Sequence, residues 1–391
     1  MIVAKALAVL AGTALTLSVL LSALETVVLP RKSFTRIART VFALSNRLLV
    51  HGWHRPSRAA RLRGLYAPIA LVSLPLVWML AVAGGFTLIF WGIGAGTLSH
   101  SFELSGSSLT TLGFSKPAGA ARVWLTFTEA IIGLGLVALL IGYLPTIYSS
   151  HAERERGITV LRPFAGTPPS AVNLLLLLHQ SGELDNPEMW RTATQWLLNL
   201  DQSHTAYPAL TYFPDSEIGS WVASIGTLLD AGSLVRSASS HLRDRDARLL
   251  KGPMMALVYG IPTLEHIARA VGLPVPPPMR PAELLVASGP PPDQSVRRPE
   301  YEQALAKLGQ VLEVPDEDVD ACWARFCRLR SGYDLALRGL AGLTLAPSAP
   351  WTTDRPAAVG RPRLLSGRPL GVDWQSRGVG DGHDRLELDQ R

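Results

Sequence analysis

The chain has 391 residues, of which 48% are apolar and only 17% are charged, and its formal net charge is +6. This length suffices for a membrane domain with one or two soluble units, and the low charge fraction is typical of an integral membrane protein. The positive charge is concentrated in one block that membrane topology explains, so the composition does not favour a nucleic-acid-binding protein.

The first predicted element is a transmembrane helix within residues 1–30. The apolar run from residue 2 to residue 29 contains only two charged residues, Lys5 and Glu25, and about 20 helical residues cross a bilayer core. A cleaved secretory signal is the alternative, because the run ends near small residues at 22–23. The run is long for a signal, however, and the basic block after it favours a retained span with its N-terminus outside.

Residues 31–65 are predicted to lie on the cytoplasmic side. Nine basic residues and no acidic residue occur between positions 31 and 63, and such blocks remain cytoplasmic. Apolar side chains at helical spacing in residues 33–50 predict an amphipathic helix on anionic lipid headgroups; a soluble basic connector is the alternative. Three arginines between positions 149 and 163 form a second cytoplasmic flank. We therefore expect an inner-membrane or plasma-membrane protein with a cytoplasmic C-terminal region.

Two more apolar runs flank a polar segment at residues 100–117. The first run predicts an outer helix at about 68–94, and the second predicts an inner helix at 123–148. Between them, residues 101–110 are expected to form a short helix with Ser101 as its N-cap. The C-terminal end of that helix would direct its partial negative charge toward the middle of the membrane.

The polar segment ends in a run that carries a chemical signal. Backbone carbonyls can replace the water shell of a dehydrated cation if several point toward one axis, and a glycine in the run tolerates backbone angles that other residues avoid. Thr111-Leu112-Gly113-Phe114-Ser115, preceded by Thr110, resembles the Thr-Val-Gly-Tyr-Gly filter of potassium channels. Residues 66–150 as a whole resemble the pore domain of bacterial two-transmembrane potassium channels. The alternative is a Ser/Thr-rich extracytoplasmic loop with a chance match.

The resemblance implies a function and an assembly. The expected fold is an all-α membrane protein with outer helix, pore helix, filter and inner helix, plus the N-terminal span and a helical cytosolic region. A ring of carbonyls needs four loops, so the expected state is a homotetramer in the lipid bilayer that conducts cations passively. The expected ligands are K⁺ or other monovalent cations at the filter carbonyls of residues 110–115, and no other metal is expected.

Two residues depart from the family pattern. Ser115 occupies the position of the last filter glycine, and serine costs about 1–2 kcal/mol wherever a positive φ is required. Lys116 follows at the outer mouth, where many of these channels have an aspartate, and four lysines there would repel cations. Two alternatives to a selective potassium channel follow from these residues. One is a weakly selective monovalent cation channel, and the other is a non-conducting membrane scaffold or sensor with a degraded filter.

The inner helix contains candidate gate residues. Gly135, Gly133 and Gly142 lie near or beyond its middle, and Pro145 lies near its cytoplasmic end. The resemblance implies that one such glycine, Gly135 before Gly133, lets the helix bend and open the gate. Close helix packing between small residues is an equally weighted alternative.

Glu129 is the one acidic residue in the inner helix. A charge at membrane depth usually has a protein or water partner. We expect Glu129 to support the filter from behind through a pore-helix hydroxyl, Ser107 or Ser108. The alternative is a position near enough to the interface to be hydrated.

From residue 151 onward the sequence has a soluble character. Residues 151–273 predict a helical cytosolic region, 274–299 a proline-rich linker, 300–346 C-terminal helices and 347–391 a disordered tail. The expected helices are at 169–182, 187–202, 216–238, 246–271, 299–313 and 316–343. Residues 204–213, HTAYPALTYF, resemble a segment of uncharacterised bacterial channel-like membrane proteins, and no chemistry can be attached to them.

Several functional classes lack their sequence signals. There is no Gly-x-Gly-x-x-Gly turn of a nucleotide-binding regulatory domain and no span with arginine at every third position, as in a voltage sensor. The histidines are dispersed, which argues against a metal site. Cys322 and Cys327 suit reduced, structural positions on a helix. No catalytic constellation is present, so neither enzyme activity nor a cofactor is predicted.

Overall fold

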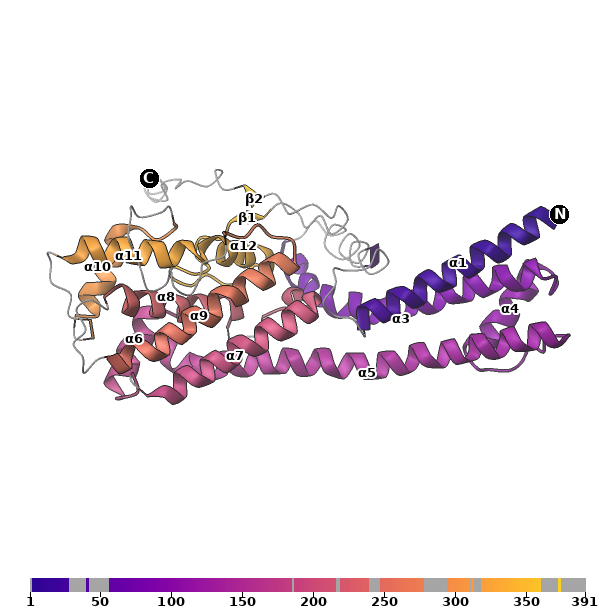
Figure 1. The fold of residues 1–391 in the computed structure, drawn as a ribbon, viewed down its shortest axis with the longest axis horizontal. Helices are drawn as coiled ribbons and strands as arrows, with labels where there is room; N and C mark the ends of the chain where they lie inside the picture. Colours follow the sequence, from indigo (N-terminus) through magenta and orange to yellow (C-terminus); the bar gives the residue numbers. More distant parts are fainter. Residues whose placement is uncertain are drawn as a thin grey trace, which may run out of the picture. The chain divides into compact units, whose positions relative to one another are not determined.

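The computed structural model of the chain is almost entirely helical and describes residues 2–27, 40–41, 56–184, 186–215, 219–238, 247–277, 294–309, 311–312, 318–359 and 372–373. Among these residues the strands are the antiparallel pair β1 (Ala358–Val359) and β2 (Val372–Asp373). The chain divides into two compact units (Figure 1). Unit 1 comprises Met1–Ala152 and Ser203–Pro214, and unit 2 comprises Glu153–Gln202 and Asp215–Arg391.

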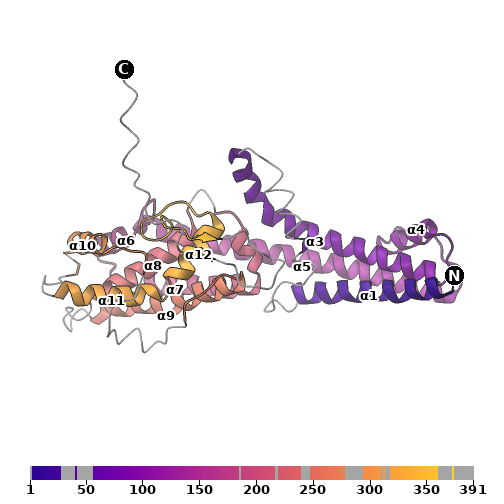
Figure 2. The ribbon, with the colours of Figure 1, turned by 90° about the horizontal axis from the view of Figure 1, so that it is seen from above.

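Unit 1 contains three helices that are long and apolar enough to cross a membrane. They are α1 (Ile2–Val27), α3 (Pro56–Gly92, apolar from residue 71) and α5 (Ala120–Ala165), of which the last continues into unit 2. A shorter helix, α4 (Leu98–Leu109), lies between α3 and α5 in the chain. In both ribbon views α4 lies at the same end of unit 1 as the N-terminus of α1 (Figures 1 and 2). The predicted amphipathic helix at 33–50 lies outside the described residues except for 40–41.

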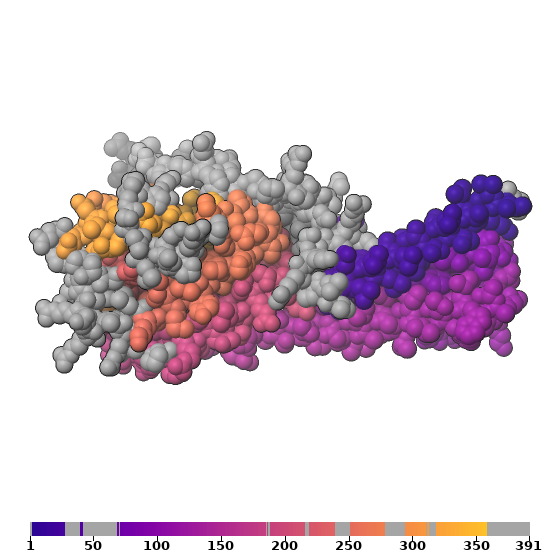
Figure 3. Space-filling view, viewed as in Figure 1, coloured from indigo at the N-terminus to yellow at the C-terminus, as the bar shows by residue number. Residues whose placement is uncertain are grey.

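Helices α1 and α3 are in contact, and the indigo surface of α1 lies against the purple part of unit 1 in the space-filling view (Figure 3). A Cβ atom placed on Gly12 would collide with the carbonyl oxygen of Gly85, and one on Gly85 would collide with the Thr16 hydroxyl. Further along, a Cβ on Gly92 would lie 2.7 Å from the carbonyl oxygen of Lys5. The two helices are therefore antiparallel, and small residues let their backbones approach closely, as is usual between membrane helices.

Gly84 and Gly85 provide a matched test of this packing. A Cβ at Gly84 would meet nothing within 4 Å, whereas one at Gly85 would collide with α1. Alanine raises helix propensity by about 1 kcal/mol over glycine, but overpacking costs about 1–3 kcal/mol. We expect Gly84→Ala to leave the melting temperature of the detergent-solubilised protein unchanged or higher, and Gly85→Ala to lower it. Equal melting temperatures for the two variants would contradict the α1–α3 contact.

Unit 2 is built around one buried helix, α8 (Trp221–Ser237). Every residue of α8 except Arg236 is buried. Helices α6 (Ala171–Gln180), α9 (Ala247–Ala270), α11 (Val319–Ser331) and α12 (Asp334–Thr344) pack around it. The remaining elements are α7 (Pro187–Ala206), the 3-10 helix η1 (Pro208–Tyr212), which belongs to unit 1, and α10 (Arg298–Lys307).

Several helix boundaries differ from the sequence prediction. Helix α3 begins at residue 56 and not at about 68, and α10 ends at residue 307 and not at 313. The inner helix was expected to end at residue 148, but α5 continues through Pro145 and Pro163 to residue 165 and ends at Gly166, which has positive φ. The single helix expected at 316–343 is two helices, since the chain turns at Gly332 and Tyr333 between α11 and α12.

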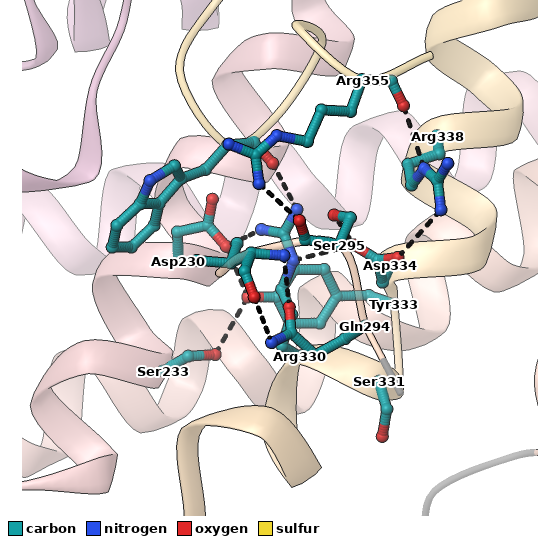
Figure 4. Close-up of polar contacts among 12 residues, drawn as sticks. Asp230, Ser233, Gln294, Ser295, Arg330, Ser331, Tyr333, Asp334, Arg338 and Arg355 are labelled. Carbon is teal, nitrogen blue, oxygen red and sulfur yellow. Dashed lines mark hydrogen bonds and ion pairs between the residues drawn. The ribbon is translucent and has the colours of Figure 1, made fainter. Parts of the chain in front are cut away.

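A buried ionic network connects α8 with α11 and α12 (Figure 4). The Arg330 side chain is fully buried and pairs with Asp230 on α8 and, at 3.0 Å, with Asp334 on α12. The Tyr333 hydroxyl donates to Asp230 over 2.7 Å and lies 3.0 Å from the Ser233 hydroxyl oxygen. Two carboxylates thus surround one guanidinium, so the buried charges are paired, as charges in protein interiors must be.

Residues 347–357 belong to unit 2, which corrects the prediction that the chain is disordered from residue 347 onward. Arg330 donates a hydrogen bond to the carbonyl oxygen of Trp351, and Arg355 donates to the carbonyl oxygen of Ser295. These contacts give the polar, proline-rich segment ionic and backbone partners in place of a large apolar surface. Because of these polar contacts, residues 347–357 pack in unit 2 despite their low hydrophobicity. The hydrogen bond from Arg355 to Ser295 also ties the end of the predicted proline-rich linker to unit 2.

Candidate functional site

The segment between α3 and α5 contains the short helix α4 and an irregular loop that leads back to the start of α5. Helix α4 begins after a turn with positive φ at Gly94 and Gly96, and the Thr97 side chain caps it by accepting a hydrogen bond from the His100 amide. The predicted N-cap Ser101 is wrong, because helix α4 begins three residues earlier and buries this residue.

Two contacts fix the depth that α4 reaches. The Ser105 hydroxyl lies 3.0 Å from the carbonyl oxygen of Ala83 on α3, and the Leu109 carbonyl oxygen lies against Gly133 on α5. Gly133 is 13 residues from the start of α5 at Ala120. At a rise of 1.5 Å per residue, the end of α4 is about 20 Å below that start.

The backbone that returns from this depth is irregular. Thr111 has φ +57° and Gly113 has φ +70°, and the residues from 112 to 114 are neither helical nor paired in a sheet. Positive φ is a true outlier for a β-branched residue such as threonine and costs about 1–3 kcal/mol. Ser115 is not among the residues with positive φ, so the strain expected for a serine in the glycine position does not arise.

Ser107 on α4 supports this returning backbone. Its carbonyl oxygen accepts from the Gly113 amide at 3.3 Å, and its buried hydroxyl accepts from the Ser115 amide at 3.1 Å. Among the described residues, no hydrogen bond reaches the carbonyl oxygens of residues 111–114. Leu112 and Phe114 are 69% and 66% exposed. The loop therefore presents acceptors and apolar side chains that no described part of the chain covers.

Glu129 is fully buried beside α4, as expected for a residue that braces the pore helix, but its partner differs from the prediction. The Ser105 hydroxyl, not Ser107 or Ser108, lies 2.5 Å from a Glu129 carboxyl oxygen. Ser107 is engaged with the loop, and the Ser108 hydroxyl donates to the Leu104 carbonyl oxygen of its own helix. Of these three serines, Ser105 is the one that hydrogen-bonds to α5. The helical positions of the serines could have indicated this, because Ser105 is one turn from Leu109, which contacts α5.

The three glycines of the inner helix differ in their surroundings. A Cβ at Gly133 would collide with the Leu109 carbonyl oxygen, whereas Cβ atoms at Gly135 and Gly142 would meet nothing within 4 Å. Gly133 thus has a packing role at the end of α4. Gly135 and Gly142 are exposed, as is Pro145, and their own subunit does not require glycine there.

The outer end of the site carries two basic residues. Lys116 is exposed, and Arg122 donates a hydrogen bond of 2.9 Å to the Gly94 carbonyl oxygen beyond the end of α3. Lys116 was expected at the mouth, but Arg122 was missed, because an arginine at a helix start gives no specific sequence signal. Together they make this end of the subunit basic.

Residues 204–213 belong to unit 1, although the sequence grouped them with the helical region at 151–273, most of which lies in unit 2. Helix η1 contacts α3, and the Tyr207 ring lies 5.8 Å from the Tyr143 ring of α5 in an edge-to-face arrangement. The Phe213 ring similarly lies 5.4 Å from the His151 ring. The aromatic residues of the 204–213 segment therefore pack it against α5. This packing role explains why no chemistry could be attached to the segment.

The rest of the described chain offers no alternative site built from metal ligands. Among the described residues, no group of three or more His, Cys, Asp or Glu side chains is placed to hold a metal ion. Cys322 and Cys327 are free and buried, and burial raises the pKa of both thiols, which favours the unreactive protonated form.

Comparison with protein-family models, with curated proteins and with solved structures found no match to this chain.

Proposed function

We propose that the chain is one subunit of a passive cation channel, with potassium as the preferred ion, whose filter is formed by residues 110–115. The observation that carries this proposal is the set of unbonded carbonyl oxygens at residues 111–114, in irregular backbone about 20 Å below the start of α5. Irregular backbone at membrane depth is tolerated only where it is buried in protein or lines a water-filled cavity. A carbonyl-lined ion path satisfies this requirement.

One loop cannot surround an ion, so the proposal includes a homotetramer around a central axis. The exposed face of α5 offers a surface for neighbouring copies as well as for lipid. Large apolar residues follow a seven-residue pattern along this face, at positions 124, 127, 131, 134, 141 and 148. The exposed filter residues of each copy would then be covered by the other three.

The proposed topology places the N-terminus and the filter mouth outside and unit 2 in the cytosol of a cell with this inner or plasma membrane. The antiparallel α1–α3 contact supports it, because Lys5 is level with Gly92 at the end of α3 that leads to the loop. The basic block at 31–63 supports a cytoplasmic position for the connection between α1 and α3.

The proposed gate lies on α5 beyond the filter. Gly135 and Gly142 have free space around them, so α5 can bend there without breaking contacts within its own subunit. Pro145, three residues after Gly142, lacks an amide hydrogen and therefore cannot donate the helical hydrogen bond to the carbonyl oxygen of Ile141. Unit 2, which contains the end of α5, would bias the opening of this gate.

Lys116 and Arg122 favour a second candidate, a weakly selective channel or a non-conducting scaffold. Four copies would place eight basic side chains near the mouth, and an array of this sign repels cations. This second candidate has the same fold as the first and differs in how much K⁺ it passes and in its preference for K⁺ over Na⁺.

Mass and flux measurements separate these candidates. We expect the purified protein to have the mass of four chains and to pass K⁺ in liposomes under a K⁺ gradient. Ser115→Gly with Lys116→Asp should raise the K⁺ flux severalfold, because four of the eight basic side chains at the mouth become acidic and its positive charge is neutralised. Arg156→Asp, at an exposed position on α5 outside the mouth, is the matched charge control and should leave flux unchanged. A monomer or dimer, or no flux in either protein, would contradict a conducting pore, and equal Na⁺ and K⁺ flux would favour the weakly selective one.

A further inference from the structure

Residues 203–214 belong to unit 1, although the chain on either side of them belongs to unit 2. Within this segment the short helix η1 packs on α3. The two residues that flank η1, Tyr207 and Phe213, each place an aromatic ring against α5. The segment therefore bridges α3 and α5, and we call residues 203–214 the clasp.

The clasp holds α5 at two levels. The Tyr207 ring lies 5.8 Å from the Tyr143 ring, and the Phe213 ring lies 5.4 Å from the His151 ring. These two α5 residues are eight positions apart, which is about 12 Å along the helix. Tyr143 is buried, and so is Ile147, which lies between them at four-residue spacing on the same face of α5. A packed surface of two helical turns is thus fixed by the clasp.

The clasped stretch of α5 begins where the proposed hinge ends. A Cβ atom added at Gly135 or Gly142 would meet nothing within 4 Å, so α5 is not held at these two glycines. A bend there displaces residues 143–151 relative to α3. Because the clasp contacts both helices, it cannot follow one of them without losing contact with the other. The clasp therefore opposes the bend.

Both ends of the clasp continue directly into unit 2. Residue 202 lies in α7, and residue 215 begins the connection to the buried helix α8. Within unit 2 the end of α5 is fixed to α7, because the Trp196 indole donates a hydrogen bond of 3.0 Å to the Arg154 carbonyl oxygen and Gly157 makes room for the Trp196 ring. A rearrangement of unit 2 therefore reaches the clasp through the chain itself.

We propose that the clasp holds α5 in the conformation of this structure, with the gate closed, and that unit 2 opens the gate by loosening the clasp. The hold on α5 stands on the contacts alone, whereas its effect on a gate rests on the proposed function. An aromatic pair shifts an equilibrium by roughly two- to tenfold beyond the effect of its buried area. Loss of both rings should therefore raise the released population of α5 by at least about fourfold.

Distances between spin labels test the hold on α5 without requiring ion flux. Val72→Cys on α3 and Tyr148→Cys on α5 place the labels at exposed positions, and the two native cysteines are buried. Labelled chains are diluted with unlabelled ones, so that each measured distance lies within one chain. We expect one narrow distance in this background and a second, longer component when Tyr207→Ala and Phe213→Ala are added. An unchanged distance distribution would overturn the clasp.

Two further variants guard this result against loss of folding and against an unspecific effect of removing a ring. Tyr207→Leu with Phe213→Leu keeps apolar bulk at both positions and should shift the distances in the same direction by a smaller amount. No shift in this variant would likewise overturn the clasp. Tyr259→Ala, which removes an exposed tyrosine ring of unit 2, is the matched control and should leave the distances unchanged. A shift as large as that of the double alanine variant would show that the clasp is not its cause.

The effect on the gate is read separately as K⁺ flux in liposomes. The double alanine variant should raise the flux by at least about fourfold. A short cleavable cross-link between Tyr143→Cys and Tyr207→Cys should lower it until a reductant cleaves the link. Unchanged flux in a conducting protein would overturn the role of the clasp in gating. Absence of flux in every variant would contradict the channel and leave the distance result intact.

Discussion

Gly133→Ala is expected to reduce ion flux at least tenfold while leaving the protein in the membrane. A Cβ at this position collides with the Leu109 carbonyl oxygen at the end of α4. The collision displaces the residue that precedes Thr110, where the returning backbone begins, and overpacking of this kind costs about 1–3 kcal/mol. Carbonyl coordination depends on position, so a small shift of the filter is enough to disturb it.

Gly135→Ala is the matched control, because its Cβ meets nothing within 4 Å. If Gly135 is the hinge, this variant changes how often the channel opens but not its preference among ions. Flux of K⁺ and Na⁺ in liposomes distinguishes the two effects. Unchanged flux in Gly133→Ala would show that the end of α4 does not position an ion path.

Arg330→Met is expected to lower the free energy of unfolding of unit 2 by about 3–5 kcal/mol. The substitution leaves the Asp230 carboxylate buried without its guanidinium partner, and burial already raises the pKa of Asp230. It also removes the hydrogen bond to the Trp351 carbonyl oxygen, which secures residues 347–357. Thermal or denaturant unfolding followed by tryptophan fluorescence measures the loss.

Two further variants locate the origin of that effect. Arg330→Met combined with Asp230→Asn should recover part of the stability, because the unpaired charge is removed. Arg338→Met changes a partly exposed arginine at the edge of the same network, which lies 3.8 Å from Asp334 and donates a hydrogen bond to the Arg355 carbonyl oxygen, and should cost only about 1–2 kcal/mol. Similar losses for Arg330→Met and Arg338→Met would show that burial of the ion pair is not the cause.

The sequence was informative where the signal was local. Long apolar runs predicted the three membrane-length helices, and the starts of α7 at Pro187 and α9 at Ala247 lie within one residue of the expected positions. Gly113 was singled out as the residue that tolerates unusual backbone angles, and it has positive φ. Glu129 was expected to bond a serine hydroxyl of the short helix, and it does, although the serine is Ser105 and not Ser107 or Ser108.

The remaining features depend on tertiary contacts that no local pattern encodes. The choice of Ser105 as the partner of Glu129 follows from which face of α4 meets α5. The pairing of Arg330 with Asp230 joins positions 100 residues apart. Residues 204–213 pack in unit 1 because their aromatic rings meet α5, and sequence order alone placed them elsewhere. Channel function itself stays a prediction, supported by the geometry of the loop.

The complete burial of α8 has a consequence for synthesis. Asp230 leaves the ribosome 100 residues before Arg330, and translation proceeds at about 5–20 residues per second. The central helix of unit 2 therefore waits about 5–20 s for its ionic partner, with apolar faces that α11 and α12 do not yet cover. During that interval the nascent chain is most exposed to aggregation, so the yield of folded protein should depend on chaperones that act before translation ends.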